Sequence, residues 1–308
     1  MNDSDTYFPA LTEDEAGQLL AAAGLAIPAG RITLEKRDER WLAHLPQDRV
    51  AWFAMSAVGR TRLLNERQTL KAIARVCTFR VPKVALEGDG WEVRDVVPGL
   101  VDPWRILGQV RQDKQYARRI GEFTAAVLIE QHMRIARADL AVTLPDTPNW
   151  PPPRAWVMER LPDVTGDKAM VGRIGALFDE YEALSVEDHD RVLVHGDLGL
   201  HNCAYDPDTL LPRGIFDYND AAWADRHLDF RYTILDIAGE PLFEAALADY
   251  ERALGRTLER RRIFLYNALC AAGFLAFRRG IAPETNWCGR TLEGDLEWTA
   301  NAIRRLTH

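Results

Sequence analysis

The sequence has few cysteines and no surplus of basic residues, and each absence excludes a class of protein. Its four cysteines, Cys77, Cys203, Cys270 and Cys288, are widely separated and include no CxxC pair. A zinc ribbon and a disulfide framework are therefore not expected, and free thiols in a reducing compartment are predicted. Acidic residues outnumber basic ones, 46 to 38, whereas a nucleic-acid-binding surface is basic. We therefore expect no nucleic-acid partner.

Long apolar runs are also missing from the chain. The apolar stretch from Leu19 to Ile27 is far shorter than the roughly 20 residues that cross a membrane as a helix. The N-terminus is acidic, unlike the basic start of a signal peptide. These features predict a cytoplasmic protein that makes no membrane contact.

The first 99 residues have the pattern of a small sheet with a helix packed on it. Thr12 and Glu15 have the spacing of a helix capping box, and Gly24 would end that short first helix. β-like runs with turn residues between them follow at 32–35, 41–45, 50–55, 81–84 and 91–97. Residues 60–76 have the apolar periodicity of a long helix. We place a lobe boundary near Gly99.

The remainder, residues 100–308, reads as mostly helical. The apolar periodicity predicts helices at 113–137, 168–185, 241–279 and 291–306. A proline-rich connector at 149–153 cannot be regular helix, and residues 155–162 after it resemble a strand. Trp150 and Trp156 flank this connector, and we expect them to pack in the core rather than form a lid over substrate.

Most of the polar chemistry lies between Arg191 and Asp229. An apolar strand, 192–194, runs into Asp197, and Asn202 follows five residues later. Two short apolar runs with a turn at 206–208 between them predict a β-hairpin that ends at Asp217. Such a hairpin returns Asn202 and Asp217 to the same edge.

This layout suits phosphoryl transfer, which gives a protein little covalent chemistry to perform. The protein must align an acceptor hydroxyl with the γ-phosphate and hold Mg²⁺ on the phosphate oxygens. Asp197 is the candidate carboxylate for the hydroxyl. The amide of Asn202 and the carboxylate of Asp217 offer the hard oxygen ligands that Mg²⁺ prefers.

The segment resembles the catalytic core of the aminoglycoside phosphotransferase family. The family's HGDLxxxN loop appears as His195-Gly196-Asp197-Leu198 with Asn202, and its I-D-[FW] strand as Ile215-Phe216-Asp217-Tyr218 with one extra residue. Its gDPxxD-like run appears as Ala224 to Asp229. The resemblance implies that Asp197 orients the acceptor hydroxyl and accepts its proton, and that Asn202 and Asp217 bind Mg²⁺. It also implies that Asp229 braces the loop and that His195 has a structural role, packed under the loop.

The resemblance extends over roughly residues 30–260 and implies an α+β, bilobal protein-kinase-like fold. A small N-terminal sheet lobe with one helix, 1–99, would bind ATP or GTP, and a larger, mostly helical lobe, 100–308, would carry the catalytic loop and the substrate site. Glu66 matches the family's helix glutamate. Asp95, Val96 and Val97 match the linker whose backbone meets the adenine edge, so these four residues are the candidates for cofactor binding.

One departure from the family lies in the third strand. Kinases of this class have a lysine there that holds the α- and β-phosphates and pairs with the helix glutamate. The expected position falls here on Ala54 or Met55, so Glu66 would lack its usual partner. Arg60 and Arg62 follow shortly and could reach the phosphates from the next loop.

The departure keeps two alternatives open beside a small-molecule kinase. The protein could be a pseudokinase that binds nucleotide without turnover. The run His195, Asp197 and His201 could also be the HxDxxxH motif of a metallohydrolase.

The acceptor is expected to be a small molecule with a hydroxyl group, such as an aminoglycoside or another amino-alcohol or sugar. Its identity, the choice between ATP and GTP, and the oligomeric state are not encoded in a readable pattern. One hypothesis is that acidic residues late in the chain attract a cationic acceptor. These residues are Glu240, Glu244, Asp249, Glu293 and Asp295.

Overall fold

The structure is a computed structural model that describes residues 6–28, 30–234 and 240–306. The described residues form two compact units. Unit 1 lies within Met1–Val101, Arg134–Leu144 and Asn202–Ala221, and unit 2 lies within Asp102–Met133, Pro145–His201 and Ala222–His308. Each unit is therefore assembled from separated parts of the sequence.

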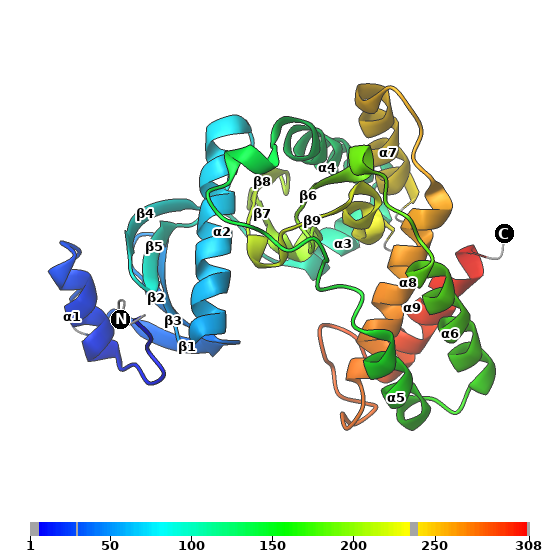
Figure 1. Ribbon diagram of the computed structural model, residues 1–308, viewed down its shortest axis with the longest axis horizontal. Coiled ribbons are helices and arrows are strands. Elements are labelled where there is room, and N and C mark those ends of the chain that lie inside the picture. Colours follow the sequence, from blue (N-terminus) through cyan, green and yellow to red (C-terminus); the bar gives the residue numbers. More distant parts are fainter. Residues whose placement is uncertain (1–5, 29, 235–239, 307–308) are drawn as a thin grey trace. The chain divides into compact units, whose positions relative to one another are not determined.

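Unit 1 is built on a five-stranded antiparallel sheet with the order β1-β2-β3-β5-β4. Its register places Ala43, Ala51 and Val93 side by side on one face. Helix α1 packs on that face through Ala16 and Leu20 (Figure 1). The bounds are α1 (Glu13–Ala22), β1 (Thr33–Arg37), β2 (Arg40–Leu45), β3 (Arg49–Ala54), β4 (Lys83–Gly88) and β5 (Trp91–Asp95).

Helix α2 (Ala57–Val76) covers the other face of this sheet (Figure 1). Its N-terminus is capped by Ser56, whose hydroxyl accepts a hydrogen bond from the Gly59 amide. The predicted capping box of α1 is also confirmed, because Thr12 and Glu15 exchange side-chain and backbone hydrogen bonds. Both caps satisfy amide groups that a helix leaves unpaired at its start.

The predicted hairpin is present as β7 (Cys203–Tyr205) and β8 (Pro212–Ile215), and it belongs to unit 1. Leu100 and Tyr205 exchange backbone hydrogen bonds, and the Ile215 amide donates to the Arg80 carbonyl. Gly214 permits this packing, because a Cβ there would lie 2.5 Å from the Arg80 carbonyl oxygen. A single division near residue 99 therefore does not describe unit 1, which also holds this hairpin.

Unit 2 is organised around α8, which is buried along most of its length. Its apolar side chains share a core cluster with residues of α5, α6 and α9. A two-stranded sheet of β6 and β9 also belongs to this unit. The bounds are α3 (Pro103–Gln112), α4 (Lys114–Arg134), α5 (Arg154–Val164), α6 (Lys168–Glu182), β6 (Arg191–Val194), β9 (Ala222–Asp225), α7 (Glu240–Leu254), α8 (Arg260–Phe277) and α9 (Leu292–Arg305).

The strand predicted at residues 155–162 is wrong, because these residues form most of α5. Val157 and Leu161 are four residues apart and fully buried on one side of the helix, which is the spacing of an amphipathic helix. The expected core packing of the tryptophans is confirmed. Trp150 stacks on Phe274 with ring centroids 5.2 Å apart, and Trp156 lies 4.5 Å from Phe277.

Two further expectations concern cysteines and membranes. All four cysteines are described and all are free thiols, as predicted. Within the described ranges, no helix combines the length and the apolar composition needed to span a membrane.

Candidate active site

The catalytic-loop residues follow strand β6 in unit 2 and are held there by Asp229. The carboxylate of Asp229 accepts hydrogen bonds from the amides of His195, at 2.7 Å, and Gly196, at 3.0 Å. Asp229 is completely buried. The expectation that Asp229 braces the loop is therefore confirmed.

Asp229 is itself held by side chains of α4. His132 Nε2 lies 3.2 Å from Asp229 Oδ2, and the Gln131 amide donates to the same oxygen at 3.4 Å. Burial would raise the pKa of Asp229, but its bonds with His132 and its contacts with His195 lower the pKa below the ordinary value. The carboxylate thus stays ionised as an acceptor in the interior.

Asp197 lies at the end of this braced loop with a quarter of its side chain exposed. His201 Nε2 is 3.1 Å from Asp197 Oδ2, and Arg231 Nη2 is 3.7 Å from Oδ1. Burial would raise the pKa of Asp197, but the His201 hydrogen bond and the nearby charges of His201 and Arg231 outweigh it and lower the pKa. Asp197 is therefore a carboxylate at neutral pH, and His201 is the donor in their hydrogen bond.

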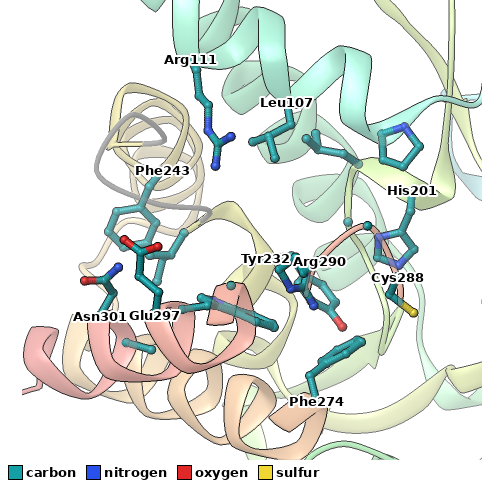
Figure 2. Close-up of a pocket in the computed structure, with 18 of the residues that line it drawn as sticks. Leu107, Arg111, His201, Tyr232, Phe243, Phe274, Cys288, Arg290, Glu297 and Asn301 are labelled. Carbon is teal, nitrogen blue, oxygen red and sulfur yellow. The ribbon is translucent and has the colours of Figure 1, made fainter. Parts of the chain in front are cut away.

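A cavity of about 1430 Å³ opens in unit 2 beside this pair (Figure 2). His201 and Tyr232 form the side next to Asp197, with their rings edge to face at 5.5 Å. Other walls come from α3, α7, α8 and α9 and from the segment 288–290. The aspartate that the sequence singled out is thus linked by one hydrogen bond to the lining of a large pocket.

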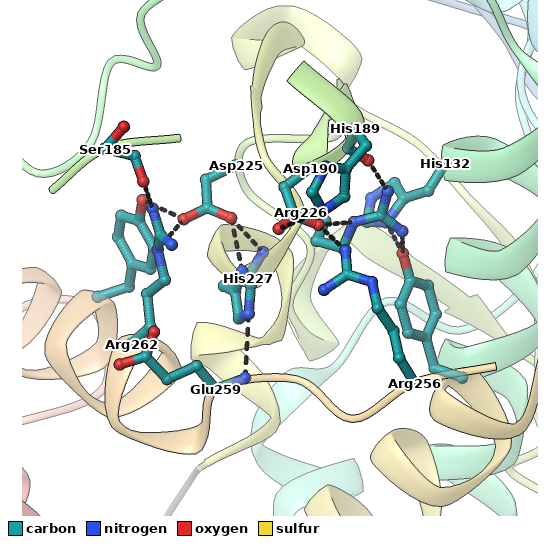
Figure 3. A network of polar contacts seen from close by, with 12 residues as sticks. His132, Ser185, His189, Asp190, Asp225, Arg226, His227, Arg256, Glu259 and Arg262 are labelled. Atoms are coloured by element: carbon teal, nitrogen blue, oxygen red, sulfur yellow. Dashed lines mark hydrogen bonds and ion pairs between the residues drawn. The ribbon is translucent and has the colours of Figure 1, made fainter. Parts of the chain in front are cut away.

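A second polar network supports unit 2 beneath the loop (Figure 3). Asp190 binds the guanidinium groups of Arg226 and Arg256. Asp225 binds the ring of His227 at 2.6 Å and the guanidinium of Arg262. All of these side chains except that of Arg256 are buried or nearly so, and each carboxylate has at least two donors. The network is therefore a structural support for β6 and β9.

The two candidate metal ligands lie together at one end of the hairpin in unit 1. The Phe216 amide donates to the Asn202 carbonyl at 3.0 Å, so Asn202 and Asp217 flank the last backbone pairing. The amide of Asn202 is buried, whereas Asp217 is exposed. Asp217 also adopts a left-handed backbone conformation with φ of 67°, which is uncommon outside glycine. An amide oxygen and a carboxylate at one hairpin end suit Mg²⁺.

Glu66 is buried in unit 1, and it has partners that the sequence analysis did not identify. Arg94 Nη1 lies 2.8 Å from Glu66 Oε1, and Arg40 Nη1 lies 3.0 Å from Oε2. Burial opposes ionisation of Glu66, but these two arginines lower its pKa to about 2. Glu66 therefore lacks the lysine that is its usual partner, as expected, and arginines on β2 and β5 pair with it instead.

The same sheet face carries a larger ionic network. Glu92 accepts from both Arg94 and Arg67, and the guanidinium of Arg40 lies 4.5 Å from the centre of the Trp52 ring. The candidate replacements for the lysine are engaged elsewhere, since Arg60 pairs with Asp89 and Arg62 with Asp38.

The linker candidates lie where β5 ends. Asp95 accepts a hydrogen bond of 2.7 Å from Arg49 Nε, and the Val96 amide donates to the Asp48 carbonyl at 2.9 Å. Val97 is buried and packs near Gly214 of the hairpin. The Val96 amide is thus already hydrogen-bonded to the Asp48 carbonyl. The next backbone groups along the linker belong to Val97.

The metallohydrolase alternative does not match the geometry. No three His, Cys, Asp or Glu side chains in the described part of the chain lie close enough to hold a metal ion. His195 is fully buried, and its Nδ1 accepts from the Asp197 amide at 3.2 Å. The HxDxxxH run therefore forms a braced loop and not a transition-metal centre.

Comparison with known proteins agrees with this picture. The family model of the phosphotransferase enzyme family, APH, matches residues 57–264. That is more than half of the chain, so the protein belongs to this family. No curated protein matches the chain.

Solved structures of related fold are numerous. The GDP complex of wild-type aminoglycoside 2'-phosphotransferase-IIIa is similar with a TM-score of 0.66 and 16% identity, over 96% of this chain and 99% of that one. The GDP and kanamycin complex of APH(2")-IIIa is similar with a TM-score of 0.64 and 17% identity, over 94% and 96%. The macrolide 2'-phosphotransferase MphH from Brachybacterium faecium is similar with a TM-score of 0.58 and 19% identity, over 94% and 98%. The chain thus has the α+β, protein-kinase-like fold that the sequence predicts.

Proposed function

We propose that this protein transfers the γ-phosphoryl group of ATP or GTP to a hydroxyl group of a small molecule. The observation that carries the proposal is Asp197, an ionised carboxylate on a braced loop, joined by His201 to the lining of a large pocket. Family membership supports the reaction class. The acceptor candidates from the sequence are an aminoglycoside-like compound or another amino-alcohol or sugar.

Asp197 would receive the hydrogen bond of the acceptor hydroxyl and accept its proton as the phosphoryl group is transferred. His201 would fix the carboxylate by donating to Oδ2. Arg231 lies 3.7 Å from Oδ1 and favours the ionised form. These residues all belong to unit 2.

Nucleotide and metal would be bound by unit 1 residues. Asn202 and Asp217 would hold Mg²⁺, which when bound neutralises charge on the phosphate oxygens. The backbone at Asp95 and Val97 would meet the base, with the Val96 amide already engaged. Glu66 would act through the arginines that surround it, since it is buried.

The pseudokinase alternative rests on one observation. No lysine projects from β3, and the arginines that replace it as partners of Glu66 are themselves 3–4% exposed. These buried arginines stabilise the sheet face, but they expose little surface to which a phosphate could bind. Turnover, and not binding alone, therefore distinguishes the two functions.

The test combines binding and turnover. Calorimetry with Mg·ATP and Mg·GTP should detect binding that depends on Mg²⁺ and weakens in Asp217→Asn. Acceptor-dependent release of ADP or GDP should then fall by at least about 10²-fold in Asp197→Asn, the scale typical of losing a general base. Binding without release for any hydroxyl compound would support the pseudokinase, and no binding of either nucleotide would reject both functions.

A further inference from the structure

We infer that the acceptor of this protein has a broad apolar ring face and does not carry several positive charges. The inference rests on the proposed function for the role of the cavity, but its evidence is the lining of the cavity itself. It replaces the hypothesis that acidic residues attract a cationic acceptor.

Aromatic side chains from five different elements line the cavity. They are Trp104, Tyr232, Phe243, Phe264, Phe274 and Trp298. Aromatic rings offer large, rigid apolar surfaces that stack on other rings, and their faces also attract cations when no other cation already lies over them.

The aromatic faces are already occupied by arginines on one side. The guanidinium of Arg290 lies 4.5 Å from the centre of the Trp298 ring and 5.4 Å from that of Phe274. Arg260 lies 5.5 Å from the centre of the Phe243 ring. A cationic ligand would therefore meet positive charge at the rings where a cation would otherwise bind.

Carboxylates near the pocket are already paired with arginines. Among the lining residues in the described part of the chain, four are arginines and three are glutamates. Glu244 is already bound by both terminal nitrogens of Arg260, at 2.7 and 2.9 Å. Asp295, which the cationic hypothesis included, is completely buried between Arg278 and Arg290. A polycation would need several carboxylates free to bind it, and the lining offers the opposite balance.

Side chains also meet the cavity from opposite walls (Figure 2). Trp104 packs directly on Gly289, where an added Cβ would lie 1.8 Å from the indole ring. In Figure 2, Arg111 and Leu107 reach into the cavity from α3, and Phe274 lies across it from them. An apolar ring system between these walls would present a hydroxyl group towards His201 and Asp197.

The experiment measures acceptor binding without nucleotide, so that its outcome does not depend on turnover. The full-length protein is titrated by calorimetry with uncharged 2-naphthylethanol, with singly charged erythromycin and with polycationic kanamycin. We expect 2-naphthylethanol and erythromycin to bind at least about tenfold more tightly than kanamycin. Trp298→Ala should weaken the binding of 2-naphthylethanol by about tenfold. Phe243→Leu provides a second variant if Trp298→Ala does not fold, and Glu293→Gln on the same helix, outside the lining, is the control.

Tighter binding of kanamycin than of both 2-naphthylethanol and erythromycin would overturn the inference. Absence of saturable binding by all three compounds would overturn it as well. In either case, phosphoryl transfer from ATP or GTP to some other hydroxyl compound would leave the proposed function standing. Binding of 2-naphthylethanol and erythromycin without phosphoryl transfer to any compound would instead reject only the proposed function.

Discussion

Glu66→Gln tests the buried ionic network of unit 1 most directly. The change keeps the side-chain size and removes the charge that Arg40 and Arg94 share. Burial opposes ionisation, yet the two arginines lower the Glu66 pKa from 4.5 to about 2. At 1.36 kcal/mol for each pKa unit, the ionised carboxylate stabilises the folded state by about 3 kcal/mol at neutral pH. Removing one partner of a buried ion pair typically costs about 3–5 kcal/mol, and we expect a loss of that size.

The pH dependence gives the prediction a second signature. Because the folded pKa of Glu66 lies below its unfolded value, the stabilisation is complete above about pH 5 and is lost as the pH falls towards 2. The difference in free energy of unfolding between the parent and Glu66→Gln should therefore stay constant from pH 8 to pH 5. It should shrink only at lower pH.

Urea unfolding followed by tryptophan fluorescence provides the measurement. Glu35→Gln is the matched control, since Glu35 also pairs with an arginine in the sheet but is exposed to solvent, where ion pairs contribute little. The control should leave the urea midpoint unchanged. A loss below about 1 kcal/mol in Glu66→Gln, or a difference that grows as the pH falls, would refute the reasoning.

Two further predictions concern the loop and the pocket. Asp229→Asn removes the charge that accepts hydrogen bonds from the His195 and Gly196 amides. Hydrogen exchange at those two amides should therefore accelerate by at least about tenfold. Unchanged protection of the two amides would contradict the bracing role. Gly289→Ala places a methyl group inside the Trp104 contact at a φ of 78°, so acceptor binding should weaken and tryptophan emission shift, while unaltered emission would mean that the wall does not depend on this contact.

Local signals in the sequence predicted the elements that depend on neighbouring residues. The capping box of Thr12 and Glu15 forms because both partners lie within one turn. The hairpin forms because two short apolar runs and a turn lie within residues 203–215. The position of Asp197 after β6 follows from the same kind of pattern. The capping box and the hairpin are fixed by contacts of short sequence separation.

Features that depend on distant residues were not predictable in the same way. Arg40 and Arg94 lie 26 and 28 residues from Glu66, and only the strand register brings them to one sheet face. The α5 segment was predicted as a strand because residues 155–162 resemble a linker strand, whereas their burial against α8 decides for the helix. The cavity is lined by side chains from most of unit 2, so no motif contains it.

The last prediction concerns His201, whose contact with Asp197 is seen only in the three-dimensional structure. The sequence presented His201 as part of a metal motif, whereas the structure places its Nε2 3.1 Å from Asp197. A hydrogen bond to a charged group contributes about 1.5–3 kcal/mol, so His201→Ala should lower kcat for acceptor phosphorylation by at least about tenfold. The KM for nucleotide should stay unchanged, because His201 belongs to the acceptor side.

His201→Gln separates positioning from packing. A glutamine amide can still donate to Asp197 but lacks the ring that packs edge to face on Tyr232. If the hydrogen bond matters, His201→Gln recovers most of the kcat that His201→Ala loses, even though both variants lose the ring contact. If the ring contact matters instead, the two variants show the same kcat and the same loss of Tm, and His201 is then a packing residue whose distance to Asp197 has no catalytic consequence.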